Sequence, residues 1–203
     1  MRLKKYNGGK ILAPLKCGTR FLDETFDGDY GNIGISDLFK ILFLPKEIEA
    51  IILRPPYEHL ISALHTEILG LHNREVEPSF NDIETVVKTF MIKNHNLESA
   101  THWSGHLYKH LYLIWRRNKN KIKIVQLKDL SDYLKSINAP IPKYDPEKYN
   151  FNHYGYWCSK DDIAFFVELN FPKEWEDFMK QIEHSNKYYN YLIGEVVDDV
   201  KLL

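Results

Sequence analysis

Short apolar runs alternate with longer amphipathic stretches along this chain, and the pattern predicts strands that alternate with helices. Two runs have the length and bulk of buried strands, residues 11–13 and 50–53, and residues 121–126 alternate between polar and apolar side chains, which predicts a third strand. Apolar residues at helical spacing predict helices over 57–71, from about 80 to 94, 107 to 115 and 128 to 137, and two more after 159, separated near Pro172. This order is typical of a single α/β domain, residues 1–203, with a central parallel sheet flanked by helices.

Local signals mark several boundaries between these elements. Ser79 followed by Asp82 is similar to a capping box, so we expect a helix to begin there. Residues 27–36 are polar and glycine-rich and predict a loop, while 38–44 fit a helix or a strand equally well. Residues 139–156 predict a long ordered loop, whose aromatic side chains could stack on a base or a sugar, or cover an edge of the core.

Composition narrows the class of protein. The 28 acidic and 27 basic residues give a net charge of −1, which gives no support for a general binder of nucleic acid or membranes. Two cysteines are too few for a disulfide scaffold, and no apolar run reaches the roughly 18 residues of a membrane span. The stretch MRLKKYNGGK lacks the apolar segment of a signal peptide, so we expect a cytoplasmic protein of a microbe or of a virus-infected cell.

The residues after the first predicted strand have the composition of an anion-binding turn. Pro14 ends the strand, and the polar turn Lys16-Cys17-Gly18-Thr19-Arg20 precedes apolar residues at helical spacing. A strand, a tight turn and a helix direct backbone N–H groups and a helix dipole toward an anion. Gly18 permits close approach of the backbone, Thr19 can cap the helix, and Lys16 and Arg20 add positive charge. An ordinary turn with solvated basic residues explains the same pattern equally well.

Three known anion-binding patterns do not fit this turn. A Walker loop needs its lysine after the second glycine, the dinucleotide fingerprint G-x-G-x-x-G is absent, and a cysteine phosphatase needs arginine where Asp23 stands. The turn instead resembles the 5′-phosphosulfate loop of sulfotransferases that use 3′-phosphoadenosine 5′-phosphosulfate (PAPS), which reads roughly P-K-x-G-T-[TR]. The matching residues are Lys16, Gly18, Thr19 and Arg20, and Leu15 stands where many members have proline.

A second motif follows the second predicted strand. Arg54 stands at the end of that strand, and Ser62 lies eight residues later within the next predicted helix. The stretch RPPYEHLIS resembles the 3′-phosphate motif of the same sulfotransferases, often R-D-P-x-x-R-x-x-S, with Pro55 in place of the acid and His59 in place of the second arginine. An arginine fork and a hydroxyl suit a phosphate monoester. Taken alone, the arginine would more often belong to a surface ion pair.

Two further stretches resemble segments of carbohydrate sulfotransferases. His102 and Trp103 are similar to the H-W-x-P segment of Golgi carbohydrate sulfotransferases, without its proline, and IVQLKDLSDYLKSI resembles a strand–loop–helix of that group. His102, His106 and His110 would share one face of a continuous helix, which permits a zinc site. No acidic or cysteine ligand accompanies them, so we expect no metal.

The resemblance covers roughly residues 10–137 and implies a P-loop-like fold and transfer of a sulfuryl group from PAPS to a hydroxyl or amine, with carbohydrates among the acceptors. It implies that Lys16 acts on the leaving group and that the N–H groups of Cys17 to Arg20 hold the 5′-phosphosulfate. Arg54 and Ser62 would hold the 3′-phosphate, and His102 would be the general base. Glu24 and His65 are the alternative bases. Because Cys17 lies beside Lys16 near a helix N-terminus, we expect its thiol pKa to be lowered, although it is not the nucleophile.

Two other function classes remain open at this stage. A nucleotide-dependent phosphotransferase of the P-loop type should carry a lysine after the glycine and an acid that holds magnesium, and neither is recognisable. A non-catalytic relative could keep the fold and bind a nucleotide or a glycan. Binding of adenosine 3′,5′-bisphosphate (PAP), with and without magnesium, separates the three classes.

Overall fold

The computed structural model describes residues 2–6, 9–14, 16–19, 22, 25–26, 31–32, 48–70, 79–95, 103, 105–119, 121–139 and 159–194. Its strands are β1 (Arg2–Tyr6), β2 (Gly9–Ala13), β3 (Gly31–Asn32), β4 (Ile48–Leu53) and β5 (Lys123–Gln126). Its helices are α3 (Pro56–Gly70), α4 (Phe80–His95), α5 (Leu107–Arg117), α6 (Leu130–Ser136), α8 (Lys160–Asn170) and α9 (Pro172–Ile193), with a 3₁₀ turn η2 (Leu127–Asp129).

The strands form one mixed sheet in the order β3-β1-β2-β4-β5. Strands β2, β4 and β5 are parallel, whereas β1 pairs antiparallel with both β2 and β3. The parallel register pairs Leu12 with Ile51 and Leu53 with Gln126. The carboxyl ends of β2, β4 and β5 therefore lie at the same edge of the sheet.

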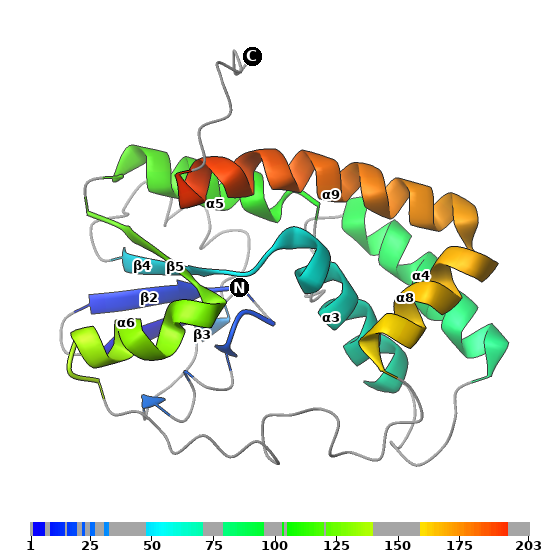
Figure 1. The fold of residues 1–203 in the computed structure, drawn as a ribbon, viewed down its shortest axis with the longest axis horizontal. Coiled ribbons are helices and arrows are strands. Elements are labelled where there is room, and N and C mark those ends of the chain that lie inside the picture. The colour runs from blue at the N-terminus through cyan, green and yellow to red at the C-terminus, as the bar shows by residue number, and fades with distance from the viewer. Residues whose placement is uncertain are drawn as a thin grey trace.

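Both faces of β2 and β4 are buried over most of their length, which explains the continuous apolar runs in their sequences, whereas β5 at the edge of the sheet is only partly buried. Leu12, Ile51 and Leu53 point to the layer that contains α5 and α9, in a core that also includes α3, α4 and α8. Their neighbours Ile11 and Ile52 point to the other face, as the period of two along a strand requires, and share a core cluster with α6 and with Cys17, Leu22 and Phe26. Figure 1 shows α5 and α9 above the sheet, α6 below it, and α3, α4 and α8 to one side.

The α/β class and the central parallel strands are confirmed, but the sheet as a whole is not parallel. Residues 2–6 were not predicted as a strand, yet they form β1 and pair antiparallel with β2. The predicted loop over 27–36 contains the two-residue strand β3. Residues 38–44, 140–158 and 195–203, for which we also predicted structure, lie outside the described residues.

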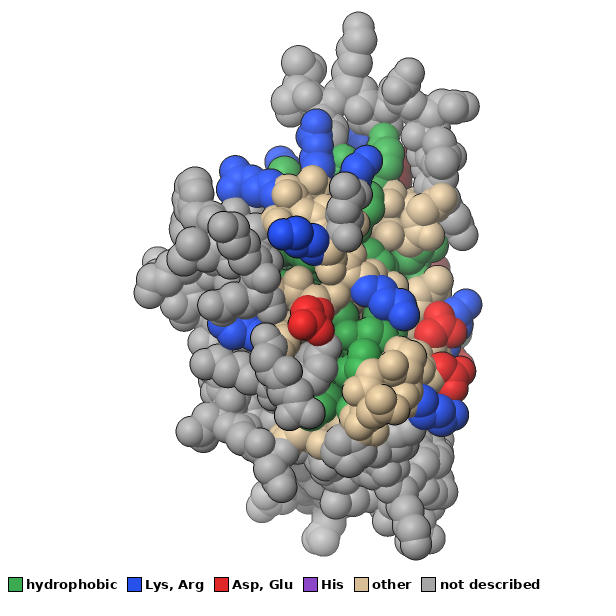
Figure 2. All heavy atoms as spheres, turned by 90° about the vertical axis from the view of Figure 1, so that its left-hand side faces the viewer, with side chains coloured by type: hydrophobic (Ala, Val, Ile, Leu, Met, Phe, Trp, Pro, Cys, Tyr) green, Lys and Arg blue, Asp and Glu red, His purple; other side chains and the backbone are tan. Residues whose placement is uncertain are grey.

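Charge is mixed on the surface at one end of the molecule. Figure 2 shows basic side chains separated by apolar and neutral ones in the upper part of this face, and acidic side chains beside basic ones in its lower part. Within the described ranges, no helix has both the length and the apolar character needed to cross a bilayer.

Candidate anion-binding site

Three turns meet at the carboxyl edge of the parallel strands. Residues 14–19 follow β2, Arg54 and Pro55 follow β4, and η2 follows β5. Ligands of open α/β sheets bind outside this edge, because the turns and helix N-termini that follow the strands gather there. Both sequence motifs that resemble anion sites therefore lie where the fold favours a ligand.

The turn after β2 is tight and partly left-handed. Lys16 and Gly18 have φ angles of 68° and 75°. The N–H of Cys17 donates to the carbonyl of Pro14 over 3.1 Å, so this amide is already engaged within the turn. A helical turn follows, in which the N–H of Leu22 donates to the carbonyl of Gly18 over 3.0 Å. Gly18 therefore occupies the N-cap position that we had expected for Thr19, since the N-cap carbonyl accepts the first helical hydrogen bond.

Gly18 is required for space as well as for conformation. A Cβ atom at this position would lie 2.8 Å from side-chain carbons of both Leu127 and Leu130. Its φ of 75° is also one that other residues rarely adopt. The turn after β2 is therefore packed directly against the η2–α6 segment, and a side chain at residue 18 would push the two apart.

Arg54 joins the two motifs. Its Nη1 donates to the carbonyl of Lys16 over 3.3 Å, and its Nε lies 3.4 Å from Oε2 of Glu58. The side chain of Arg54 is 17% exposed and that of Glu58 is 58% exposed. An ion pair with so exposed a partner contributes only about 0–1 kcal/mol. Glu58 therefore holds the guanidinium of Arg54 only weakly.

Cys17 corrects one sequence-based expectation. Its side chain is fully buried, and burial raises the pKa of its thiol to about 12, although the charge of Arg54 and a backbone hydrogen bond from Arg54 act in the opposite direction. Desolvation of the thiolate outweighs these favourable charges. The expectation of a lowered pKa was therefore wrong.

A side chain of the helix layer donates a hydrogen bond to the carbonyl of Arg54. The hydroxyl of Tyr108, on α5, donates to it over 2.6 Å, and Nδ1 of His59 lies 3.1 Å from the same hydroxyl. His59 is fully buried, and its ring contacts Trp103 edge-on with centroids 5.3 Å apart. This accounts for histidine where the 3′-phosphate motif has a second arginine, because the side chain faces the core.

The remaining residues of the predicted site are only partly described. Ser62 and His65 lie on α3 and are buried, with 6% and 2% exposure. Arg20, Glu24 and His102 lie outside the described residues. Helix α5 begins at Leu107, so His106 precedes it and His110 lies in its first turn. Among the residues that the structure describes, no three histidine, cysteine or acidic side chains gather as a metal site.

Lys160 is a basic residue near the site that sequence reasoning missed. It is the first residue of α8, and burial together with the charge of Arg54 lowers the pKa of its ammonium group. Nothing in the local sequence could have placed it there, because 106 residues separate it from Arg54. Helix α8, which begins with Lys160, packs against α3, the helix that follows Arg54.

Known proteins add no further information about this site. Comparison of the chain with protein families, curated proteins and solved structures gives no match.

Proposed function

We propose that this chain is a sulfotransferase that moves a sulfuryl group from PAPS to a hydroxyl or amine of an acceptor, on a P-loop-like sulfotransferase fold. One observation carries the proposal. Two motifs that each resemble a PAPS phosphate site, 38 residues apart in sequence, touch through Arg54 Nη1 and the carbonyl of Lys16. Two anion sites at adjacent parallel strands suit a nucleotide that carries charge at both its 5′ and 3′ positions.

The proposed 5′ subsite is the turn after β2. The ammonium of Lys16 would neutralise the bridging oxygen as the sulfuryl group leaves. Of the backbone N–H groups expected to hold the phosphosulfate, those of Gly18 to Arg20 would do so, because the N–H of Cys17 already donates to the carbonyl of Pro14. Sulfuryl transfer parallels phosphoryl transfer, in which positioning and charge stabilisation supply most of the rate. A sulfuryl group carries less charge than a phosphoryl group, so the proposed reaction requires no metal to gather it.

The proposed 3′ subsite is formed by Arg54 and Ser62. Arg54 already lies at the mouth of the turn, held on one side by the Lys16 carbonyl and on the other by the exposed Glu58. The guanidinium fork can bind a phosphate monoester in the same two-bonded way as a carboxylate. Binding would exchange Glu58 for the 3′-phosphate.

The proposed general base accepts the proton of the acceptor nucleophile. His102 is the first candidate by its likeness to the His-Trp segment, with Glu24 and His65 as alternatives. Trp103 packs against His59 and donates its ring N–H to Gln181 over 3.2 Å, which fixes the chain immediately after His102. The acceptor itself stays open, and carbohydrates are the class that the resemblance favours.

Calorimetry with PAP tests the nucleotide. We expect PAP to bind in the presence of a chelator, and to bind better than ATP with or without magnesium. Arg54→Ala should weaken PAP binding by about 1.5–3 kcal/mol, or roughly 10–150-fold, because a charged hydrogen-bonding partner is lost. Glu58→Gln is the matched control, and it should keep or improve the affinity because it removes a competing carboxylate. Preferred binding of ATP, or equal losses in both variants, would contradict the assignment.

Transfer of labelled sulfate from PAPS tests the reaction. Incubation with a panel of glycans, lipids and hydroxylated metabolites should label one class of acceptor. PAP binding without transfer to any acceptor would favour the non-catalytic relative.

A further inference from the structure

A chain of buried polar groups ends on the backbone of Arg54. The hydroxyl of Tyr108 donates to the Arg54 carbonyl over 2.6 Å, and Nδ1 of His59 lies 3.1 Å from that hydroxyl. Tyr108 and His59 are both fully buried. Polar groups in such a position are expensive to leave unpaired, so these hydrogen bonds hold all three groups in one arrangement.

The direction of each hydrogen bond follows from the donors available. A hydroxyl has one hydrogen, and the hydroxyl of Tyr108 gives it to a carbonyl that can only accept. The contact with His59 must then be donated by Nδ1–H of the ring. Burial raises the pKa of Tyr108 well above its ordinary value, so the phenol remains a donor at all working pH values.

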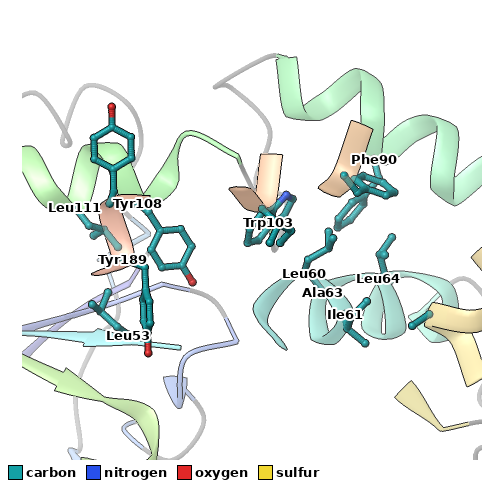
Figure 3. Packing of buried hydrophobic residues seen from close by; sticks show 14 of the residues in the cluster. Leu53, Leu60, Ile61, Ala63, Leu64, Phe90, Trp103, Tyr108, Leu111 and Tyr189 are labelled. Atoms are coloured by element: carbon teal, nitrogen blue, oxygen red, sulfur yellow. The ribbon is translucent and has the colours of Figure 1, made fainter. Parts of the chain in front are cut away.

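Aromatic rings hold the tyrosine itself in place. Tyr108 meets Tyr189 of α9 edge-on, with centroids 6.0 Å apart, and lies 6.2 Å from the ring of Trp103. Figure 3 shows the rings of Tyr108 and Tyr189 projecting from the helix layer toward β4. The hydroxyl of Tyr189 in turn contacts Oε1 of Gln126 over 3.4 Å, at the end of β5. The helix layer therefore reaches the ends of two neighbouring parallel strands.

Arg54 is fixed at both its backbone and its side chain. Its carbonyl accepts from Tyr108, a backbone hydrogen bond joins it to Cys17, and its guanidinium reaches the Lys16 carbonyl. A shift of this carbonyl would change the backbone conformation of Arg54 and therefore the direction in which its side chain points.

We propose that Tyr108 is a positioning residue whose hydroxyl, held by His59, fixes the Arg54 carbonyl and so aims the guanidinium at the 3′-phosphate. This inference rests on the proposed function, because it assigns Arg54 to that phosphate. Tyr108 acts through Arg54 and touches neither the nucleotide nor the acceptor. Its effect should therefore fall on nucleotide affinity and not on the chemical step.

Tyr108→Phe tests the positioning role, with PAP affinity of the wild type measured first. In this variant we expect PAP affinity to fall about 5–50-fold, the range for one buried hydrogen bond, with a matching rise in KM for PAPS and kcat within about twofold. Tyr112→Phe is the control, since Tyr112 is also buried on α5 but contacts Trp115, Tyr188 and Tyr191. This control should leave PAP affinity unchanged.

A double-mutant cycle separates positioning from general destabilisation. In the Arg54→Ala background, Tyr108→Phe should cost less than about twofold in PAP affinity, because the group that it positions is gone. An equal loss in both backgrounds would overturn the proposal, and so would an unchanged affinity in Tyr108→Phe alone. Failure of the wild type to bind PAP would instead refute the proposed function, and the positioning role with it.

Substitutions of His59 give a second test of the positioning role, which holds even if the Tyr108→Phe variant does not fold. In His59→Asn, the side-chain amide can donate from nearly the same place as Nδ1–H, so PAP affinity should stay within about threefold of wild type. His59→Leu removes the donor and should lose affinity to the same extent as Tyr108→Phe. Equal PAP affinities in His59→Asn and His59→Leu would contradict a role of the His59–Tyr108 hydrogen bond in positioning Arg54.

Discussion

Lys16 and Gly18 both have positive φ angles, so the unusual backbone of the candidate site lies within residues 16–18. Gly18 adopts its φ of 75° at no steric cost, but Lys16 has a side chain and still holds a φ of 68°. A residue other than glycine in this region carries strain of order 1 kcal/mol, which persists only where the surroundings impose it. The surroundings here include the guanidinium of Arg54 on the Lys16 carbonyl. Strain of this kind gathers at ligand sites, which agrees with the proposed role of this turn.

Substitution of Lys16 tests its action on the leaving group. Lys16→Ala should lower kcat by about 10²–10³, the scale of losing one preorganised stabiliser, because charge on the leaving oxygen grows only in the transition state. PAP affinity should fall much less. Lys135→Ala, at an exposed lysine near the end of α6, is the control and should leave both quantities unchanged. Steady-state kinetics with PAPS give the comparison, and a normal kcat in Lys16→Ala would refute the proposed mechanism.

The thiol of Cys17 should react slowly in the folded protein. Burial raises its pKa from 9.0 to about 12, so the thiolate fraction near pH 8 is about 10³-fold below that of an exposed thiol. Alkylation by iodoacetamide, measured in a Cys158→Ser variant, should be slow in buffer and fast in concentrated guanidinium chloride. Its rate should rise about tenfold per pH unit from pH 7 to 10. A plateau in this range would mean that the pKa of the folded thiol is not raised to about 12.

The same pKa shift sets a pH dependence of stability. The unfolded thiol ionises near pH 9.0 while the folded thiol stays neutral to about pH 12. The unfolded state therefore releases a proton first, and this contribution to stability is lost as pH rises above about 9. The sequence showed only the neighbouring lysine and the turn, which both lower the pKa. The opposing desolvation comes from packing against residues far along the chain, such as Leu134.

At the scale of elements, local patterns were sufficient wherever a helix or strand has a buried face. Strands β2, β4 and β5 and helices α3, α4, α5, α8 and α9 agree with the predicted segments, because their apolar spacing comes from the cores that they bury. Strand β1 was missed because its residues are mostly charged. Asn7-Gly8, which follows β1, is a typical hairpin signal that could have revealed the pairing with β2.

The predicted capping box of α4 is confirmed. The N–H of Ser79 donates to Oδ2 of Asp82 over 2.9 Å, and the N–H of Asp82 donates to Ser79 Oγ over 3.3 Å. Ser159 and Asp162 form the same box at α8, with the same spacing, although it was not predicted. Both boxes could be found from sequence, because a cap depends only on residues three positions apart.

Removal of the cap should cost stability without affecting the candidate site. Ser79→Ala should lower the free energy of unfolding by about 1 kcal/mol, which corresponds to roughly 2–4 °C in Tm for a chain of this size. Ser131→Ala, at an exposed position of α6, is the control and should stay within about 1 °C. Thermal unfolding followed by circular dichroism gives both values. An unchanged Tm in Ser79→Ala would mean that the cap is replaced by solvent.

At the scale of the whole molecule, the sheet brings together residues that no local pattern connects. Arg54 and Tyr108 are 54 positions apart, and His59 and Tyr108 are 49 apart. The sequence could place Lys16 and Arg54 each at the end of a strand, and the parallel register then made them neighbours. It could not reveal the tyrosine behind Arg54, because a buried tyrosine on an amphipathic helix has the same pattern as any other core residue.

PAP should therefore stabilise the molecule as a whole, because it would join the turns after β2 and β4. At 100 times its Kd, a ligand that binds only the folded state adds about 2.7 kcal/mol, or roughly 5–11 °C in Tm for a domain of this size. The shift should be the same with EDTA as with magnesium, and adenosine alone, which lacks both phosphates, should give almost none. In Arg54→Ala the shift at the same PAP concentration should shrink by about 3–10 °C, following the expected loss of affinity. A shift that requires magnesium, or one that Arg54→Ala leaves intact, would place the nucleotide elsewhere and favour a phosphotransferase over sulfuryl transfer.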